Sequence, residues 1–411
     1  MPATTTLALR DPPVPAPAAG SASGLVALAD RCVKCGLCLP HCPTYHLDRH
    51  ESESPRGRIA YARAVASGDL APTATGDLHL DHCLGCRRCE PVCPAGVRYG
   101  ELLVAARDAQ AARRRRPWRE RLALGLLARP RLLDRLLGVY RSSQAWLPAA
   151  WRMLPPPPAA GPPVATREGA RQPKTDVAFP VGDASAPLPD ATRPPAIFIG
   201  CIARRYEAPT RDALLRLLAA AGVAARIPDD QGCCGAAARH AGATAQGAAL
   251  AAANRQAFAG DGRVLCLASG CHDTLATSLD GVAAVEDPLA LLDRLGDRLR
   301  WRAADTRVAL HLPCTQRSVV GTGPATRRLL ARIPGLELAA LPDTGCCGAA
   351  GLHQLTAPDR AAAFRQPLLA ALADSGATRL LSANIGCRLH LADGTRLPVV
   401  HPIDFLAEHL A

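Results

Sequence analysis

The sequence predicts an α+β chain of several domains: an α-helical, cysteine-rich domain near the N-terminus, followed by a small α/β unit that occurs twice. Three observations support this fold class. Two cysteine runs of identical spacing lie between residues 32 and 93. The segments around them have helical periodicity, and the C-terminal half repeats its cysteine motifs at a nearly constant distance. With 411 residues, the chain is long enough for several separate cores.

Composition divides the chain into five regions. Residues 1–23, rich in Pro and Ala, are expected to be a flexible tail. The helical domain should span 24–112, with helices at 24–31, 55–67 and 100–116. Basic amphipathic helices and a Pro-rich linker, which begins near 155, should occupy 113–195. The two α/β units are predicted at 196–300 and 301–411.

The charge balance does not indicate nucleic acid as a partner. The formal net charge of +12 comes almost wholly from arginine, since Lys34 and Lys174 are the only lysines. Aromatic residues make up 3% of the chain and do not alternate with the basic residues, and no zinc-finger or RNA-binding signature is present. We therefore expect no nucleic-acid partner.

The N-terminal residues show no signal-peptide pattern, and no uncharged apolar run approaches the length of a transmembrane helix. We therefore expect a cytoplasmic protein whose membrane contact, if any, is peripheral. In that reducing compartment, clustered cysteines are metal ligands rather than cystines.

The segment 113–152 is amphipathic and basic. It carries four consecutive arginines, Arg113 to Arg116, and a leucine series interrupted by Pro130. Such helices can lie on an anionic membrane or dock a partner. We favour the alternative interpretation, a helical pair packed on its own domain with a solvated basic face.

The strongest motif is C-x2-C-x2-C-x3-C-P, which occurs twice. Three thiolates from one tight turn bind three irons of a cubane cluster, while the fourth points away and completes the other cluster. The spacing therefore predicts two [4Fe-4S] clusters with crossed ligands: Cys32, Cys35, Cys38 and Cys93 for one, and Cys83, Cys86, Cys89 and Cys42 for the other.

Several residues near these runs fit the same interpretation. Gly36 and Gly85 would let the backbone approach the inorganic sulfides, and Arg56 and Arg58 would hold the intervening loop against the negative charge of the clusters. Two zinc sites are the alternative, but zinc needs only four ligands and gains nothing from a crossed arrangement. The long, helical segment between Cys42 and Cys83 favours an α-helical ferredoxin-like domain of the succinate dehydrogenase type.

The C-terminal half contains a duplicated set of four cysteines. Cys201, Cys233 and Cys234 each precede a matching cysteine by 113 residues, and Cys271 precedes its match by 116. The motifs fall where strands end or helices begin, which is where open α/β sheets bind ligands. A further cluster, a zinc ion and a redox-active thiol site are all compatible with these residues: Cys201, Cys233, Cys234 and Cys271 in the first unit, and Cys314, Cys346, Cys347 and Cys387 in the second.

Three other residues belong to this half of the chain. His240 and His353 each follow the second cysteine of a pair by six residues, so they are candidate ligands or proton carriers, or else merely packed. Cys266 has no counterpart and is expected to be a buried strand thiol. No catalytic acid or base can be assigned.

With both motif classes in one chain, the sequence resembles the bacterial glycolate oxidase iron–sulfur subunits, within the wider CCG-domain group that includes heterodisulfide reductase subunits. The likeness covers nearly the whole chain past residue 24. It rests on five stretches: Cys42-Pro-Thr-Tyr45, Ser54-Pro-Arg-Gly-Arg-Ile59, Cys93-Pro-Ala-Gly-Val-Arg-Tyr99, Ala268-Ser-Gly-Cys271 and Ala383-Asn-Ile-Gly-Cys387.

The resemblance implies an electron-transfer subunit. A separate FAD subunit would oxidise glycolate to glyoxylate, and this chain would pass the electrons to a respiratory acceptor such as quinone at the cytoplasmic side of the inner membrane. The chain shows no flavin or nicotinamide fingerprint of its own. Related complexes act on D-lactate, D-2-hydroxyglutarate or glycerol 3-phosphate.

The sequence departs from the full CCG pattern at one position in each unit. Ala268 and Asn384 stand where that pattern has a further cysteine, which puts a noncubane cluster of the heterodisulfide reductase type in doubt. Two other functional classes stay open. The chain could be a self-contained thiol or quinone reductase, or its C-terminal half could be a docking scaffold stabilised by zinc.

Overall fold

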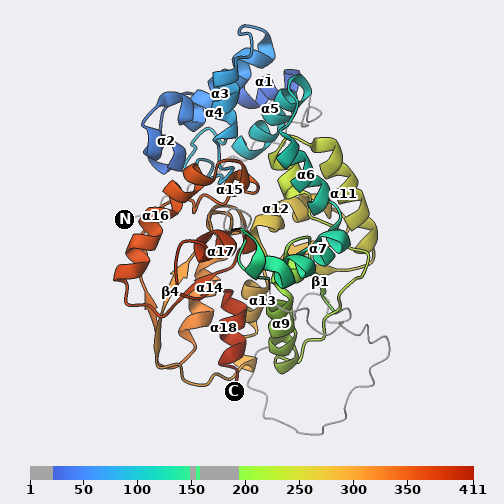
Figure 1. Cartoon of the computed structure of the whole chain (residues 1–411), viewed down its shortest axis with the longest axis vertical. Coiled ribbons are helices and arrows are strands. Elements are labelled where there is room, and N and C mark those ends of the chain that lie inside the picture. Colours follow the sequence, from blue (N-terminus) through green and yellow to red (C-terminus); the bar gives the residue numbers. More distant parts are fainter. Residues whose placement is uncertain (1–21, 149–153, 158–193) are drawn as a thin grey trace, which may run out of the picture.

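The computed structural model describes residues 22–148, 154–157 and 194–411 (Figure 1). Nearly all of the predicted N-terminal tail and most of the predicted Pro-rich linker lie outside these residues. Within them, the predicted fold class is confirmed: a helical domain is followed by two small α/β units, and the helical domain lies against one end of the paired units.

The N-terminal domain is built from helices alone, with no strand between residues 22 and 148. Helix α3 begins and ends where the sequence predicts, because Ser54 caps its first turn by accepting from Gly57 N and Gly68 ends it in a left-handed conformation. Leu102 and Leu103 are buried against the neighbouring helices. The elements are α1 (Ala22–Asp30), η1 (Leu39–His41), α2 (Pro43–Asp48), η2 (Glu51–Glu53), α3 (Pro55–Ser67), α4 (Ala74–Asp81) and α5 (Tyr99–Arg113).

A helical pair, α6 (Trp118–Leu127) and α7 (Pro130–Ser143), followed by the short η3 (Gln144–Trp146), connects this domain to the rest of the chain. Pro130 separates the two helices as predicted, and it occupies the first turn of α7, where a missing N–H is harmless. Leu133 and Leu137 are buried against the two α/β units. One face of the pair therefore packs on its own chain, as the alternative interpretation of 113–152 requires.

The strand orders of the two α/β units correspond, with one strand fewer in the first unit. In the first, β1 (Ala196–Phe198), β2 (Arg263–Cys266) and β3 (Ala284–Glu286) pair in that order. In the second, the order is β5 (Leu336–Ala339), β4 (Thr306–His311), β6 (Arg379–Ser382) and β7 (Val399–Val400). All pairs are parallel.

One expected strand is missing. The alternation of apolar runs and helical stretches predicts a strand of the first unit at 223–228, but this segment contributes only an isolated parallel bridge from Arg226 to Ala196. Arg226 lies 113 residues before Ala339 of β5, so the bridge holds the place of β5 in the duplicated topology. The duplication inferred from the cysteine spacing therefore extends to the strand order.

Helices cover both sheets. The first unit contains α8 (Ala203–Tyr206), α9 (Ala208–Ala220), α10 (Ala236–His240), α11 (Thr244–Ala257), α12 (Ser269–Ser278), α13 (Pro288–Arg294) and η5 (Gly296–Arg298). The second contains η6 (Gln316–Val320), α14 (Gly323–Ala331), α15 (His353–Thr356), α16 (Pro358–Asp374), α17 (Ile385–Ala392) and α18 (Pro402–Glu408).

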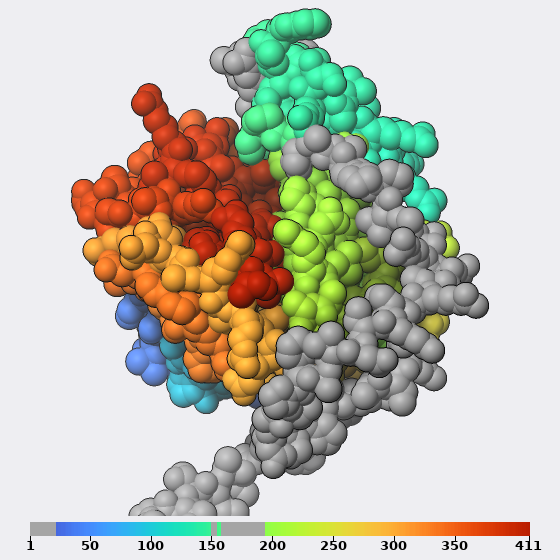
Figure 2. Space-filling model, turned by 90° about the horizontal axis from the view of Figure 1, so that it is seen from below, coloured from blue at the N-terminus to red at the C-terminus, as the bar shows by residue number. Residues whose placement is uncertain are grey.

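The two units share one apolar core. Helix α18 of the second unit packs on α9 of the first, and α13 of the first packs on α14 of the second. Leu214, Leu291, Leu329 and Phe405 are all buried in the same cluster. Each such side chain contributes roughly 1.5–3 kcal/mol on burial, so the core fixes the two units firmly to each other. Each unit also has a smaller apolar cluster of its own, which contains Val264 in the first unit and Leu380 in the second. The limits 196–300 and 301–411 stay a prediction. The two units form the main body seen in Figure 2.

Candidate functional site

The two cysteine turns of the helical domain have the same backbone shape. Lys34 and Gly36 in the first turn have φ values of 57° and 86°, and Gly85 and Arg87 at the equivalent positions of the second turn have 59° and 56°. A left-handed non-glycine residue costs about 1–2 kcal/mol. Each turn therefore has two left-handed residues, one a glycine and one a strained charged residue. The glycine stands at the second of these positions in the first turn (Gly36) and at the first in the second turn (Gly85).

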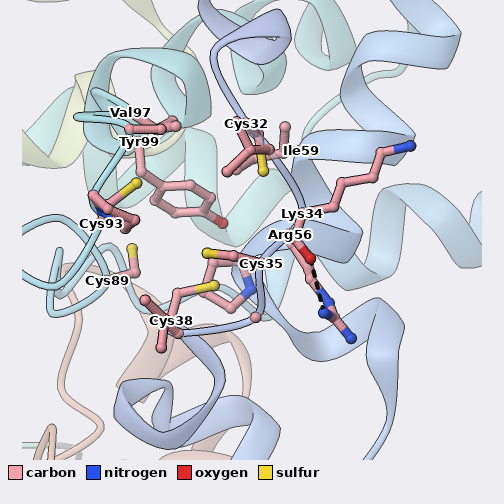
Figure 3. Close-up of a pocket in the computed structure, with 16 residues that line it drawn as sticks. Cys32, Lys34, Cys35, Cys38, Arg56, Ile59, Cys89, Cys93, Val97 and Tyr99 are labelled. Carbon is pink, nitrogen blue, oxygen red and sulfur yellow. Dashed lines mark hydrogen bonds between the residues drawn. The ribbon is translucent and has the colours of Figure 1, made fainter.

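The first set of four thiols surrounds one cavity. Cys32, Cys35, Cys38 and Cys93 line it together with apolar side chains and Tyr99 (Figure 3). All seventeen cysteines of the chain are free thiols, so no disulfide competes for these sulfur atoms. A Cβ atom at Gly36 would lie 2.8 Å from Arg56 Nη1, so this guanidinium would have to move, and the φ of 86° disfavours any side chain at this position. Converging thiols in an apolar cavity suit an iron–sulfur cubane.

The second set of four thiols is more deeply buried. Burial raises the pKa of Cys89, and the neighbouring Cys86, Cys83 and Cys42 raise it further. Burial likewise raises the pKa of Cys86. Thiols this close together repel one another once ionised, so thiolate forms only where a bound cation compensates its charge. The four side chains therefore fit a cluster as ligands.

The two thiol sets of the helical domain are in contact with each other. Cys89 of the second set also lines the cavity of the first, as Figure 3 shows. The Tyr99 hydroxyl, which faces the first cavity, donates to Cys83 Sγ of the second set at 3.5 Å. The structure therefore brings together both sets that the sequence predicts. Their crossed assignment remains a prediction.

A buried guanidinium lies beside the second set. Arg58 is 1% exposed, and its pKa is raised although burial opposes its charge, because Cys83, Tyr99, Glu53 and Cys42 surround it. It donates to Glu53 Oε2 at 2.5 Å and to the Thr44 hydroxyl at 2.9 Å. Arg56 lies on the surface instead, paired with Glu51 at 2.6 Å and bonded to the Lys34 carbonyl. Arg58 thus places a fixed positive charge beside the second thiol set.

Glu53 is the centre of a network that sequence reasoning missed. His79 Nδ1 and His82 Nδ1 each lie 2.6 Å from its Oε1 atom, and Arg58 and Arg360 bind Oε2. Burial opposes ionisation, but the hydrogen bonds from His82 and His79 and the charge of Arg58 hold the pKa of Glu53 at about 2. The two guanidinium groups already neutralise this carboxylate, which disfavours a divalent cation there. The spacing of the two histidines, one helical turn apart at the end of α4, was the available signal.

In the first α/β unit, the four matched cysteines form a continuous chain of contacts. Cys233 Sγ lies 3.5 Å from Cys201 Sγ, and Cys234 contacts both Cys233 and Cys271. The contact with Cys233, together with burial, raises the pKa of Cys201. Cys266 is buried on β2 as predicted, and its thiol donates to the Ala268 carbonyl.

The second unit repeats this arrangement. Cys314 Sγ and Cys346 Sγ are 3.8 Å apart, and Cys347 contacts Cys346 and Cys387. The extra cysteine of the full CCG pattern is replaced here by Asn384, whose Oδ1 accepts from Gly386 N at 3.0 Å and caps α17. That position therefore has a structural role in this chain. In each unit four buried or half-buried thiols gather at one point, which suits a tetrahedral metal ion or a cluster.

The helical domain contacts both α/β units through its second cysteine turn. Arg87 pairs with Asp273 of the first unit at 2.9 Å, and Arg88 pairs with Asp343 of the second at 2.9 Å. Cys86, between Gly85 and Arg87, packs on a buried cluster that contains Cys314 and Cys346. The second thiol set and the cysteines of the second unit are therefore neighbours.

The two histidines singled out from the sequence lie at this junction. A Cβ atom at Gly85 would lie 2.5 Å from His240, so the imidazole touches the second cysteine turn. Burial and the charge of Arg107 lower the pKa of His240 to about 4. His353 is buried; its Nδ1 atom lies 3.0 Å from the Gly348 carbonyl. Neither is shown to contact a cysteine thiol.

In the described part of the chain, no helix combines the length and the apolar character needed to cross a membrane.

Comparisons with known proteins agree with these two classes of site. A 4Fe-4S dicluster domain model matches residues 28–97, and a cysteine-rich domain model matches residues 195–276 and 308–392. The chain is 32% identical to the glycolate oxidase iron–sulfur subunit of Escherichia coli K12, over 92% of this chain and 93% of that one. It is also 32% identical to the probable glycolate oxidase iron–sulfur subunit of Bacillus subtilis 168, with the same coverage.

A more distant relative is a dihydromethanophenazine:CoB–CoM heterodisulfide reductase subunit of Methanosarcina barkeri, at 24% identity over 89% of this chain and 88% of the relative. The similarity to both glycolate oxidase subunits extends over the helical domain and both α/β units. The chain therefore belongs to the family of glycolate oxidase iron–sulfur subunits, and it is an iron–sulfur protein that serves as the electron-transfer part of an oxidoreductase.

Proposed function

We propose that this chain accepts electrons from FAD-containing partner subunits that oxidise glycolate to glyoxylate, and that it passes them to a respiratory acceptor such as a quinone. One observation supports a route through three of the four thiol sets. The thiol sets are contiguous: Tyr99 and Cys89 lie between the first and second sets, and Cys86 packs beside Cys314 and Cys346 of the second unit. Single electrons can cross such short separations without a mobile carrier.

The proposed ligands of two [4Fe-4S] clusters are the crossed sets predicted from the spacing: Cys32, Cys35, Cys38 and Cys93, and Cys83, Cys86, Cys89 and Cys42. When bound, such clusters supply reversible one-electron storage. The protein contributes the apolar walls, the left-handed turns and the Arg58 charge. The matched sets in the two α/β units, which begin at Cys201 and Cys314, are proposed to hold a further cluster or zinc.

The helical pair α6–α7 is proposed to bind the cytoplasmic surface of the inner membrane. The pair exposes large apolar side chains, with Trp118 62% exposed and Val139 66%, and Trp146 of the adjoining η3 is 89% exposed. Residues 113–146 contain ten arginines against Glu120 and Asp134. Exposed apolar groups among arginines are typical of a monotopic contact with anionic lipid.

Vesicle sedimentation tests the membrane contact. The holo-protein should sediment with vesicles containing anionic phosphatidylglycerol, less so with neutral ones, and be released by high salt. Replacing Trp118 and Val139 by Ser should weaken sedimentation at every salt concentration. Equal sedimentation of wild type and variant would contradict this surface as the contact.

Stopped-flow absorbance tests the electron-transfer function. The anaerobically prepared chain is mixed with the FAD-containing glycolate-oxidising subunits of the same organism, and glycolate is added. Bleaching of the iron–sulfur absorbance, dependent on both glycolate and the flavoprotein, is expected. D-Lactate, D-2-hydroxyglutarate and glycerol 3-phosphate serve as alternative donors. Dithionite, which reduces the clusters directly, is the positive control. If dithionite bleaches the iron–sulfur absorbance but none of the four donors does, the proposed function is wrong.

A second candidate is a self-contained thiol or quinone reductase. The similarity to the heterodisulfide reductase subunit and the thiols that line a cavity between the two units favour it. This candidate predicts disulfide- or quinone-dependent oxidation of the reduced chain without any flavoprotein donor, lost in Cys234→Ser or Cys347→Ser. Retention of that activity in both variants would eliminate it.

A further inference from the structure

The second cysteine turn of the helical domain is covered by the α/β units. Leu84 of this turn is 5% exposed and packs among buried residues of the second unit. Arg87 and Arg88, which follow it, pair with carboxylates of the first and the second unit. This turn is therefore a docking face within the chain. It buries one apolar side chain at the contact, and cations next to the cluster ligands pair with carboxylates on the other side.

The first cysteine turn has the same backbone shape, but its corresponding face is exposed. Val33 stands at the position of Leu84 and is 67% exposed, and Leu37 is 56% exposed. All seventeen cysteines lie in the described residues, and Cys35 alone among them is exposed. Apolar side chains exposed around one ligand of a redox group indicate a surface that a partner covers. We call this surface the first-turn patch; its members are Arg31, Val33, Lys34, Cys35 and Leu37.

The first-turn patch has two cations without an acidic partner. Lys34 and Arg31 are exposed, and among the residues that the structure describes neither forms an ion pair. Figure 3 shows the Lys34 side chain extending away from the cavity of the first thiol set. The neighbouring carboxylates, Asp30 and Glu51, are each paired with another arginine. A partner that carries carboxylates therefore complements this patch.

The backbone of Lys34 supports the same interpretation. Its φ is 57°, at the position where the second turn has Gly85. This left-handed conformation is sterically unfavourable for a residue with a side chain, and such residues gather at functional sites. Arg87, the strained charged residue of the second turn, pairs with Asp273 of the first α/β unit. Lys34 has no such carboxylate within the described part of the chain, so we expect a partner to supply it.

The position of the patch in the series of thiol sets indicates which partner it fits. Every residue that lines the cavity of the first set belongs to the helical domain, so this set forms one end of the series. Near the other end, Leu133 and Leu137 of α7 pack in one cluster with Cys201 and Cys271 of the first α/β unit. Helix α7 belongs to the pair that is proposed to contact the membrane. A lipid-soluble acceptor is therefore closer to the α/β units, and the first set is left for a water-soluble donor.

We propose that the FAD-containing partner docks on the first-turn patch, where it covers Val33 and Leu37 and pairs its carboxylates with Lys34 and Arg31, so that electrons enter the chain beside Cys35. This inference rests on the proposed function and assigns the donor its docking surface. Two electrons leave the reduced flavin one at a time for the iron–sulfur groups of the thiol sets, and the flavin protons go to water. No covalent bond to this chain forms or breaks. Interfaces between redox proteins are small, so one turn with its flanking cations suffices as the centre of the contact.

The lysine content of the chain allows a direct test. Lys34 is the only lysine among the described residues, and Lys174 is the only other lysine of the chain. A carbodiimide joins an amine to a carboxylate that touches it, without a spacer. The full-length, anaerobically reconstituted chain is treated with it together with the FAD-containing glycolate-oxidising subunits of the same organism, and mass spectrometry identifies the joined peptides. A link from Lys34 to a carboxylate of the flavoprotein is expected. Lys34→Arg keeps the charge, so it should lose the link and keep the Kd.

Biolayer interferometry of the same two proteins measures the Kd. Leu37→Ser should raise it at least tenfold. Leu70→Ser is the matched control, because Leu70 is 43% exposed and follows the far end of α3, a helix roughly 20 Å long. Arg31→Glu with Lys34→Glu should raise the Kd at least tenfold at low salt and much less at high salt. Arg216→Glu, at an exposed position of α9, should leave it unchanged.

Iron content and EPR spectra of each variant must match the wild type, and Val33→Ser replaces Leu37→Ser if the latter loses iron. An unchanged Kd in the patch variants, with bleaching by the flavoprotein as fast as in the wild type, would overturn the docking surface and leave the proposed function intact. Links from Lys174 in place of Lys34 would do the same. Self-association of the chain alone, abolished by Leu37→Ser, would assign the patch to a second copy instead. A flavoprotein that fails to bleach the wild type would refute the proposed function itself.

Discussion

Replacing Arg58 by Met tests whether the buried guanidinium stabilises the second thiol set. Arg58 is 1% exposed and donates to Glu53, to Thr44 and to the His79 carbonyl at 2.6 Å. Removing one partner of a buried pair costs about 3–5 kcal/mol, because the other charge stays buried. At about 2–4 °C of Tm per kcal/mol, the holo-protein should melt roughly 6–20 °C lower.

Scanning calorimetry of the anaerobic holo-protein measures this shift, and Arg56→Met is the matched control. Arg56 lies on the same helix in a surface pair with Glu51, so its loss should change stability by at most about 1 kcal/mol. In Arg58→Met, Glu53 keeps Arg360 as its one guanidinium partner, so adding Glu53→Gln removes a poorly compensated charge and should restore part of the lost Tm. Equal losses for the two arginine variants, or no restoration, would refute the reasoning.

A second readout separates electrostatics from packing. The positive charge of Arg58 favours the more negative, reduced state of a neighbouring redox group, so its removal should lower one of the two midpoint potentials seen by EPR-monitored titration. The other potential should stay nearly constant. Arg58→Lys, which keeps the charge, should retain most of the potential while losing the fork of hydrogen bonds.

Three further predictions concern ligands, pH and the domain junction. If the crossed assignment is right, Cys35→Ser with Cys93→Ser should disable one cluster, whereas Cys35→Ser with Cys42→Ser should disable both; iron content and EPR spin counts measure the difference. Burial raises the pKa of Asp287 to about 6, although its hydrogen bonds lower it. The protonated carboxyl group therefore contributes to stability in full below its usual pKa of 3.8, and this contribution is lost as the pH rises through 6. Asp287→Asn should therefore raise Tm at pH 7 and flatten its pH dependence, and a Tm at pH 7 no higher than wild type would contradict this. Gly85→Ala adds a methyl group 2.5 Å from a histidine of the first α/β unit and should lower Tm by several degrees; an unchanged Tm would show that this contact is dispensable.

The helical domain was the most predictable part of the fold. The limits of α3 follow from Ser54, Pro55 and Gly68, which act through bonds within a few residues. The missing strand at 223–228 shows the opposite case. Its apolar pattern is compatible with a strand, but strand length depends on the partner, and here β1 offers Arg226 only one bridge. Local pattern cannot supply that information.

The same contrast applies to the candidate site. The spacing of the eight N-terminal cysteines indicated which thiols would meet, because a turn of fixed geometry sets their distances. The pairing of Arg360 with Glu53 could not be found this way, since Arg360 comes from the second unit, 307 residues from Glu53 in the sequence. Long-range charge pairs leave no periodic trace in a single sequence.

By itself, the sequence determined the elements that arise locally: two cysteine turns, their flanking helices and a duplicated α/β unit with matched thiols. Only the tertiary structure decided how these parts face one another. Mutual packing of α9, α13, α14 and α18 between the units turns both cysteine edges toward a common cavity, and Arg87 and Arg88 hold the second turn against both. Burial of a shared apolar core drives that arrangement, and it depends on surfaces that no short segment contains.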